Sequence, residues 1–128
     1  MGRNFRTIKA WELADNLAVD IYKVTRSFPK EEIYGLVSQM RRAAVSVAAN
    51  ICEGSSRKTI KDFSHFLTIA RGSLAEVEYY IHLTERLGYL KPDEAARLSI
   101  AQRETAVTLS GFIKTVSQSL SLEVAEKQ

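Results

Sequence analysis

Apolar residues recur along most of this chain at alternating steps of three and four, the spacing that places side chains on one face of an α-helix. The pattern is longest between residues 59 and 87, where it forms a heptad seam typical of bundled helices: Ile60, Phe63, Leu67, Ala70, Leu74, Val77, Ile81 and Thr84. Similar stripes flank it, comprising Ile8, Trp11, Leu17, Ile21, Val24 and Phe28 on one side and Leu98, Thr105, Leu109, Phe112, Val116 and Leu120 on the other. No long stretch alternates as a half-buried strand does, so the sequence predicts an all-α protein.

Three positions are typical of helix starts. Pro29 and Pro92 are each followed by acidic residues, which suits the first turn of a helix, because proline loses no needed N–H there and acids complement the helix dipole. Thr59 is followed three residues later by Asp62, as in a capping box. These starts separate four predicted helices, at residues 8–26, 30–54, 59–87 and 92–121.

Glycines indicate where these helices end or approach one another. Gly54 and Gly88 follow the second and third apolar stripes and are predicted stops. Gly72 lies inside the third helix, where it costs about 1 kcal/mol relative to alanine, so we expect it to mark a close helix approach. After Leu122 the chain is polar and is predicted to be a frayed tail.

Short connections place consecutive helices antiparallel. A chain of 128 residues can bury a core without metals or disulfides and is predicted to be one domain, 1–128. The predicted fold class is therefore an all-α, antiparallel up-down-up-down four-helix bundle.

The second helix carries more apolar surface than one bundle face needs. On a helical wheel its core face contains Leu36, Met40, Ala43, Val47 and Ile51. A second cluster of small apolar residues, Val45, Ala48, Ala49 and Cys52, lies on another side. A helix that is apolar on two sides is usually buried on two sides, so we predict that the second cluster forms a subunit interface in a homo-oligomer. The alternative is that this helix is simply central in its own bundle.

Between the two apolar faces runs a polar stripe made of Arg42, Ser46, Asn50 and Glu53. We interpret it as a structural network in which Glu53 pairs with Arg71 of the third helix and Arg42 reaches an acidic residue there. Asn50 is expected to cap backbone groups near the helix end. Breaking a buried ion pair of this kind would cost about 3–5 kcal/mol.

Charge changes this picture only modestly. The net charge is +3, and residues 1–61 contain 11 Lys and Arg against 6 Asp and Glu. The simplest explanation is a solvated surface. Cys52 is the only cysteine, which excludes an internal disulfide and fits a reducing compartment. No signal peptide or membrane-spanning stretch is recognisable, so we expect a cytoplasmic protein.

Catalytic and metal sites are poorly supported. The two histidines, His65 and His82, are separated by nearly five helical turns, so one ion cannot use both within a subunit. Cys52 stands among alanines without a nearby histidine, which favours an inert thiol. No phosphate-binding glycine loop occurs, and Arg57 and His65 do not have the spacing of a bundle ribonuclease. We expect no enzyme activity, no cofactor and no metal.

A basic cluster at one end of the bundle is the strongest functional feature. An antiparallel arrangement brings the turn between the second and third helices close to the start of the first helix. Six cations then share one end, which we call the basic pole: Arg3, Arg6, Lys9, Arg57, Lys58 and Lys61. With only Phe5 and Trp11 nearby, backbone phosphate contact is favoured over base stacking. The alternative is a solvated surface without a ligand.

The segments FPKEEIYGLVSQMRRAAVSVAANICEG, FSHFLTIARGSLAEVEYYI and LGYL carry a resemblance to a known family. The chain resembles the four-helix bundle proteins whose members include those encoded by intervening sequences in bacterial 23S ribosomal RNA genes. More distantly, it is similar to the accessory protein of diversity-generating retroelements, which acts with a reverse transcriptase and RNA. The resemblance implies a left-handed bundle that assembles into a ring-shaped homopentamer. Many relatives have proline where Ala48 stands and alanine at Cys52, so the second helix is expected to be straighter here.

Two functional hypotheses follow. The first is a non-enzymatic oligomeric bundle that binds RNA or a ribonucleoprotein partner through the basic pole. The second is a protein-interaction scaffold that binds no nucleic acid.

Overall fold

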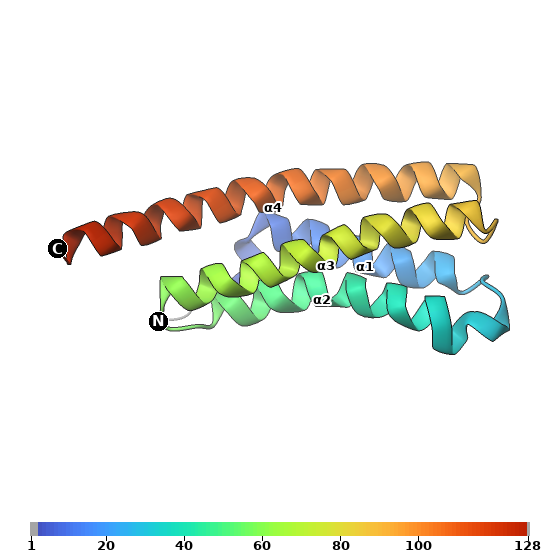
Figure 1. Cartoon of the computed structure of the whole chain (residues 1–128), viewed down its shortest axis with the longest axis horizontal. Helices are drawn as coiled ribbons and strands as arrows, with labels where there is room; N and C mark the ends of the chain where they lie inside the picture. Colours follow the sequence, from blue (N-terminus) through green and yellow to red (C-terminus); the bar gives the residue numbers. More distant parts are fainter. Residues whose placement is uncertain (1–2, 128) are drawn as a thin grey trace.

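The computed structural model describes residues 3–127, and within them every regular element is helical (Figure 1). The prediction of a four-helix all-α protein is confirmed. The long helices are α1 (Lys9–Thr25), α2 (Ser38–Ser55), α3 (Ile60–Arg86) and α4 (Pro92–Glu126). Short helical turns precede α1 and α2: η1 (Phe5–Thr7), η2 (Lys30–Glu32) and η3 (Ile33–Val37).

The helices lie side by side along one direction, and successive connections are at alternate ends (Figure 1). The α1–α2 and α3–α4 connections lie at one end, and the α2–α3 turn lies at the other. Helix α2 packs against α1 and α3, while α4 packs against α1 and α3. The left-handed twist implied by the family resemblance stays a prediction.

The predicted apolar stripes form the core. In α3 the whole seam is buried except Ile60, which is half-buried. The outer stripes are also buried, except for Trp11, Phe112 and Leu120, which are half-buried. Several core residues were not in the predicted stripes: Ala10, Ala14, Ala44, Ala95 and Ile113. Most of these are alanines, whose small side chains give a weak periodic signal.

Several predicted helix signals are confirmed at atomic level. The Thr59 hydroxyl accepts a hydrogen bond from the Asp62 backbone N–H at 3.1 Å. At the start of α4, the Glu94 carboxylate accepts a hydrogen bond from the Lys91 N–H at 3.0 Å, and Pro92 is the first helical residue. Gly88 has φ +79°, a left-handed conformation that glycine adopts without penalty after α3.

The single helix predicted over residues 30–54 is wrong in its first part. A 3₁₀ turn, η2, leads into the wider π-type turn η3, and regular α2 begins only at Ser38. Gly35 interrupts the helix with φ −108° and ψ −112°. A Cβ there would lie 2.8 Å from Oε1 of Glu32, so the glycine leaves room for that carboxylate. Helix α2 is then unbroken across Ala48.

Two further expectations are corrected. Residues after Leu122 are not a frayed tail, because α4 continues to Glu126, although its last buried residue is Val116. The close helix approach lies at Gly54, not at Gly72. A Cβ on Gly54 would lie 2.9 Å from Cβ of Phe66, whereas one on Gly72 would meet nothing within 4 Å.

Candidate nucleic-acid interface

The basic pole lies where the chain begins and where α2 turns into α3 (Figure 1). The Arg3 backbone N–H donates to the Ser55 carbonyl at 3.1 Å, and Nη1 of Arg3 donates to the Arg57 carbonyl at 3.3 Å. These two bonds attach the segment before α1 to the α2–α3 turn. Arg3 and Arg57 are therefore brought together, although 54 positions separate them in sequence.

Aromatic rings support the arginines of the pole. The guanidinium of Arg3 lies 4.5 Å from the ring centroid of Phe63, and that of Arg57 lies 4.6 Å from the ring centroid of Phe66. Arg6 covers Phe5 at 4.6 Å. Stacking of this kind restricts the motion of an otherwise flexible cation, so the three arginines of the pole are held more firmly than free side chains would be.

Sequence reasoning named Phe5 and Trp11 as the nearby aromatics and missed Phe63 and Phe66. The Phe5 and Trp11 rings do pack edge to face, with centroids 4.8 Å apart. Phe63 had been assigned only to the core seam, and it is 2% exposed. Its contact with Arg3 joins residues that are far apart in the sequence, so no local spacing could have indicated it.

Acidic residues offset part of the charge at the pole. Glu53 accepts a hydrogen bond from Nη2 of Arg57 at 2.6 Å, and Glu12 lies 3.7 Å from Nζ of Lys9. Asp62 and Glu53 line a small hollow beside Arg57. Within residues 3–127 the remaining four cations of the pole form no ion pair: Arg3, Arg6, Lys58 and Lys61. All four are exposed and can meet phosphates directly.

The polar stripe of α2 is arranged differently from the prediction. Ser46 and Ser73 share a hydrogen bond of 2.8 Å between α2 and α3, and Nδ2 of Asn50 donates to the Ser46 carbonyl and hydroxyl at 2.8 and 2.9 Å. This small neutral cluster connects the two helices, and Ser73 was missed. Asn50 caps no helix end; its amide stays within its own helix.

The expected buried ion pairs are not formed in the described part of the chain. Glu53 pairs with Arg57 rather than with Arg71, and both partners are substantially exposed. Arg42 and Arg71 are exposed and make no side-chain hydrogen bond or ion pair within residues 3–127. Long charged side chains at the edge of a helix can remain hydrated, and this avoids the desolvation cost of a buried pair.

The second apolar cluster of α2 divides between core and surface. Ala48 is buried in this chain's own core and Cys52 is half-buried, whereas Val45 is 43% exposed and Ala49 is exposed. Ala48 therefore belongs to the bundle core as well. The interface expected at Val45 and Ala49 stays a prediction.

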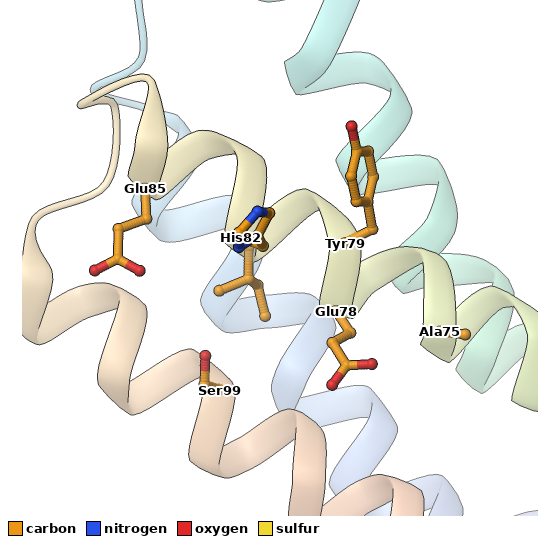
Figure 2. A pocket seen from close by; sticks show the side chains of 7 residues that line it. Ala75, Glu78, Tyr79, His82, Glu85 and Ser99 are labelled. Carbon is orange, nitrogen blue, oxygen red and sulfur yellow. The ribbon is translucent and has the colours of Figure 1, made fainter.

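A hollow of about 470 Å³ beside α3 and α4 is lined by titratable groups, but their side chains do not point toward one common position (Figure 2). Glu78 and Glu85 extend toward α4, and the His82 ring lies on the α3 surface between them. In residues 3–127 no three His, Cys, Asp or Glu side chains are placed to hold a metal ion. Over the same residues no helix is both long enough and apolar enough to cross a membrane.

Comparison with known proteins identifies a family and a solved structure that are similar to this chain. A family model described as "23S rRNA-intervening sequence protein" matches residues 6–111. A crystal structure of a protein of unknown function from the S23 ribosomal protein family of Bacteroides thetaiotaomicron VPI-5482 superimposes with a TM-score of 0.76 at 24% identity. The match covers 82% of this chain and 95% of that one, and it shows a shared fold. No curated protein sequence matches.

Proposed function

The chain belongs to the 23S rRNA-intervening sequence protein family, and on that premise we propose that it is a non-enzymatic, oligomeric helical bundle that binds RNA, alone or within a ribonucleoprotein, through its basic pole. One observation carries the proposal: four exposed cations without carboxylate partners share the end of the bundle where Arg3 and Arg57 are held on phenylalanine rings. Phosphate contacts of this kind need no base-reading groups, because counterion release drives them.

Salt dependence is the quantitative signature of such contacts. Four phosphate contacts give a slope of roughly −3 in log affinity against log salt, so affinity should fall about 50- to 150-fold between roughly 50 and 200 mM salt. Assembly of several chains would bring several poles together and steepen this slope. A mobility-shift titration of structured RNA at the two salt concentrations measures it.

Charge reversal at the pole provides the direct test. The double variant Lys58→Glu, Lys61→Glu should weaken RNA binding and flatten the salt slope. Its matched control is Arg71→Glu, Arg103→Glu, because these exposed cations on α3 and α4 lie away from the pole and also form no ion pair in residues 3–127. Equal losses in both variants would indicate a general charge effect and refute a role of the pole.

The oligomeric part of the proposal rests on the exposed apolar positions of α2. Val45→Glu should dissociate the assembly while preserving helicity, because it places a charge on the surface that the partner would cover. Light scattering and circular dichroism measure the two properties. A mass unchanged from that of the wild-type oligomer would refute this interface; a wild-type monomer would refute oligomerisation itself.

A protein-interaction scaffold is the second candidate, and exposed apolar side chains on α4 favour it. Ile100 and Val107 are 63% and 69% exposed and occupy the same outer face, seven residues apart. Affinity purification with and without nuclease separates the candidates. A partner protein retained after nuclease treatment, together with no RNA binding at low salt, would favour the scaffold.

A further inference from the structure

A nearly fully exposed tyrosine stands at the opposite end of the bundle from the basic pole. Tyr34 in η3 is 96% exposed, and its neighbour Ile33 is 49% exposed. Both precede the regular part of α2, because the irregular turn at Gly35 separates them from it. A tyrosine ring normally covers apolar surface of its own protein, so a ring this exposed is available for a stacking partner.

Arg41 is held in place beside this tyrosine. Its Nε donates to Oγ1 of Thr25 at 2.9 Å, its Nη2 donates to the Tyr22 carbonyl at 3.4 Å, and its guanidinium lies 4.5 Å from the Tyr22 ring centroid. A hydroxyl, a carbonyl and a ring orient the cation, but none of them neutralises it. Arg41 therefore keeps its full positive charge in a preorganised position.

Arg42 adds a second cation to the same place. It is exposed, and neither arginine forms an ion pair within residues 3–127. Both arginines line the same hollow, so an anion bound there would be attracted by two cations that no carboxylate neutralises.

These groups line one open hollow of about 340 Å³. Tyr22, Tyr34, Ser38, Arg41 and Arg42 contribute rings, a hydroxyl and the two cations, and no acidic residue lines it. The nearby carboxylate of Glu32 is engaged elsewhere, accepting hydrogen bonds from the Tyr89 hydroxyl at 2.9 Å and the Leu36 N–H at 3.5 Å. The hollow therefore combines exposed aromatic surface with unneutralised positive charge.

We propose that this hollow binds an unpaired nucleotide of single-stranded RNA, with its base stacked on Tyr34 and its phosphate held by Arg41 and Arg42. The inference rests on the proposed RNA-binding function and adds a second, structurally separate contact to it. A nucleotide supplies a flat ring and an anion in one unit, which matches both features of the hollow. An acidic peptide would satisfy the arginines but would leave the Tyr34 ring uncovered. Bases within a duplex are already stacked and cannot cover it either.

Fluorescence anisotropy with a labelled oligouridylate of about 12 nucleotides, a length within the usual site size, tests the proposal. Tyr34→Ala should weaken its binding roughly tenfold, as expected for loss of one stacked base, and Tyr34→Phe should retain the affinity. Arg42→Gln should weaken binding and reduce the salt slope by about 0.7, the value for one single-strand phosphate contact. The matched controls Tyr79→Ala and Arg103→Gln, exposed residues of the same types on α3 and α4, should leave binding unchanged.

Substrate choice supplies the decisive comparison. A duplex of the same length should bind wild type and Tyr34→Ala within a factor of about two, because it offers no unpaired base. The inference is overturned if wild type does not bind oligouridylate, if Tyr34→Ala binds it as wild type does, or if oligoglutamate of equal charge competes equally well. The last result would identify an acidic-protein site instead.

The inference and the proposed function can fail separately. Loss of oligouridylate binding in Tyr34→Ala, with structured-RNA binding insensitive to Lys58→Glu, Lys61→Glu, would support the hollow and refute the pole. The reverse pattern would refute the hollow and support the pole. Tyr34 and Arg42 are exposed, so unchanged circular dichroism melts should accompany both substitutions.

Discussion

The two ends of the bundle differ in how their helices are connected. At the basic pole, residues 56–59 connect α2 to α3, whereas at the other end the longer segment 26–37, which includes η2 and η3, connects α1 to α2. Just before the short turn, Gly54 of α2 packs closely against Phe63 and Phe66 of α3. The Arg3 N–H also donates a hydrogen bond to the Ser55 carbonyl there. In the longer connection the Glu32 carboxylate accepts hydrogen bonds from the Tyr89 hydroxyl and the Leu36 N–H. The buried Phe28 also packs against the Tyr89 ring there. The comparison shows two ways to place cations: on aromatic rings beside a short turn, or beside an open hollow at the end with the longer connection.

Overpacking the close contact at Gly54 should have the largest effect. Gly54→Val would place its Cβ 2.9 Å from Cβ of Phe66 and 3.0 Å from Cδ1 of Phe63, so α2 and α3 must separate. We expect the free energy of unfolding to fall by about 1–3 kcal/mol in urea titrations.

Gly72→Ala is the matched control within the neighbouring helix. Its new methyl group meets nothing within 4 Å, so it should raise the free energy of unfolding by about 0.5–1 kcal/mol through helix propensity. Similar destabilisation by the two substitutions would contradict close packing at Gly54.

Disturbing the hydrogen bonds of Glu32, at the end opposite the basic pole, should lower the free energy of unfolding by less. Gly35→Ala would push Oε1 of Glu32 away, and the carboxylate would lose its hydrogen bonds to Leu36 and Tyr89. Since the displaced group is the end of a flexible side chain, we expect a loss of about 1 kcal/mol. The cost should shrink in a Tyr89→Phe background, because the two substitutions break the same contact. Strict additivity in this double-mutant cycle would show that Glu32 does not couple them.

The hydrogen bond between Tyr89 and Glu32 should also make the stability of the protein sensitive to high pH. The hydrogen bond to Glu32, followed by partial burial and the charges of Glu32 and Glu31, raises the pKa of Tyr89 above its ordinary 10.0. A raised pKa in the folded state means that the contribution to stability is complete below pH 10 and is lost as pH rises through the folded-state pKa. Melting temperature should therefore fall more steeply above pH 10 in wild type than in Tyr89→Phe. Parallel curves would contradict this role of the hydrogen bond.

The smallest effect is expected for the ion pair at the basic pole. Glu53→Ala should cost less than about 1 kcal/mol, because the Glu53–Arg57 pair is exposed and solvent screens it. The difference from wild type should shrink further in high salt. A loss of several kcal/mol would instead indicate the buried network that the sequence suggested.

Apolar periodicity was sufficient to predict the four helices and most of the core, because a seam repeated over several turns leaves few alternatives. It failed at residues 30–37, where apolar Ile33, Leu36 and Val37 continue the pattern although Gly35 and the Glu32 carboxylate interrupt the helix. The interpretation of Gly72 as the site of a close helix approach failed for a different reason. A lone glycine in a helix does not reveal what faces it, and only the packing of α2 on α3 distinguishes Gly54.

The basic pole could be predicted from the sequence because helix order alone brings its six cations to one end. The ring under Arg3 could not, since its contact with Phe63 depends on how the segment before α1 folds back onto α3. The polar stripe was overinterpreted for a related reason. Helical position places Arg42 and Glu53 on one line, but it does not determine whether that line faces a neighbouring helix or water.

The length of α4 has a mechanical consequence. Ten residues follow its last buried residue, Val116, up to its end at Glu126, and they add about 15 Å of helix at the same end as the basic pole. Amide hydrogens should therefore exchange in a gradient along this one helix, slowest before Val116 and fastest in the final turns. A reporter attached at Glu126, the last residue of α4, would lie at the same end of the molecule as the basic pole and could sense a ligand bound there by energy transfer without replacing any residue of the pole.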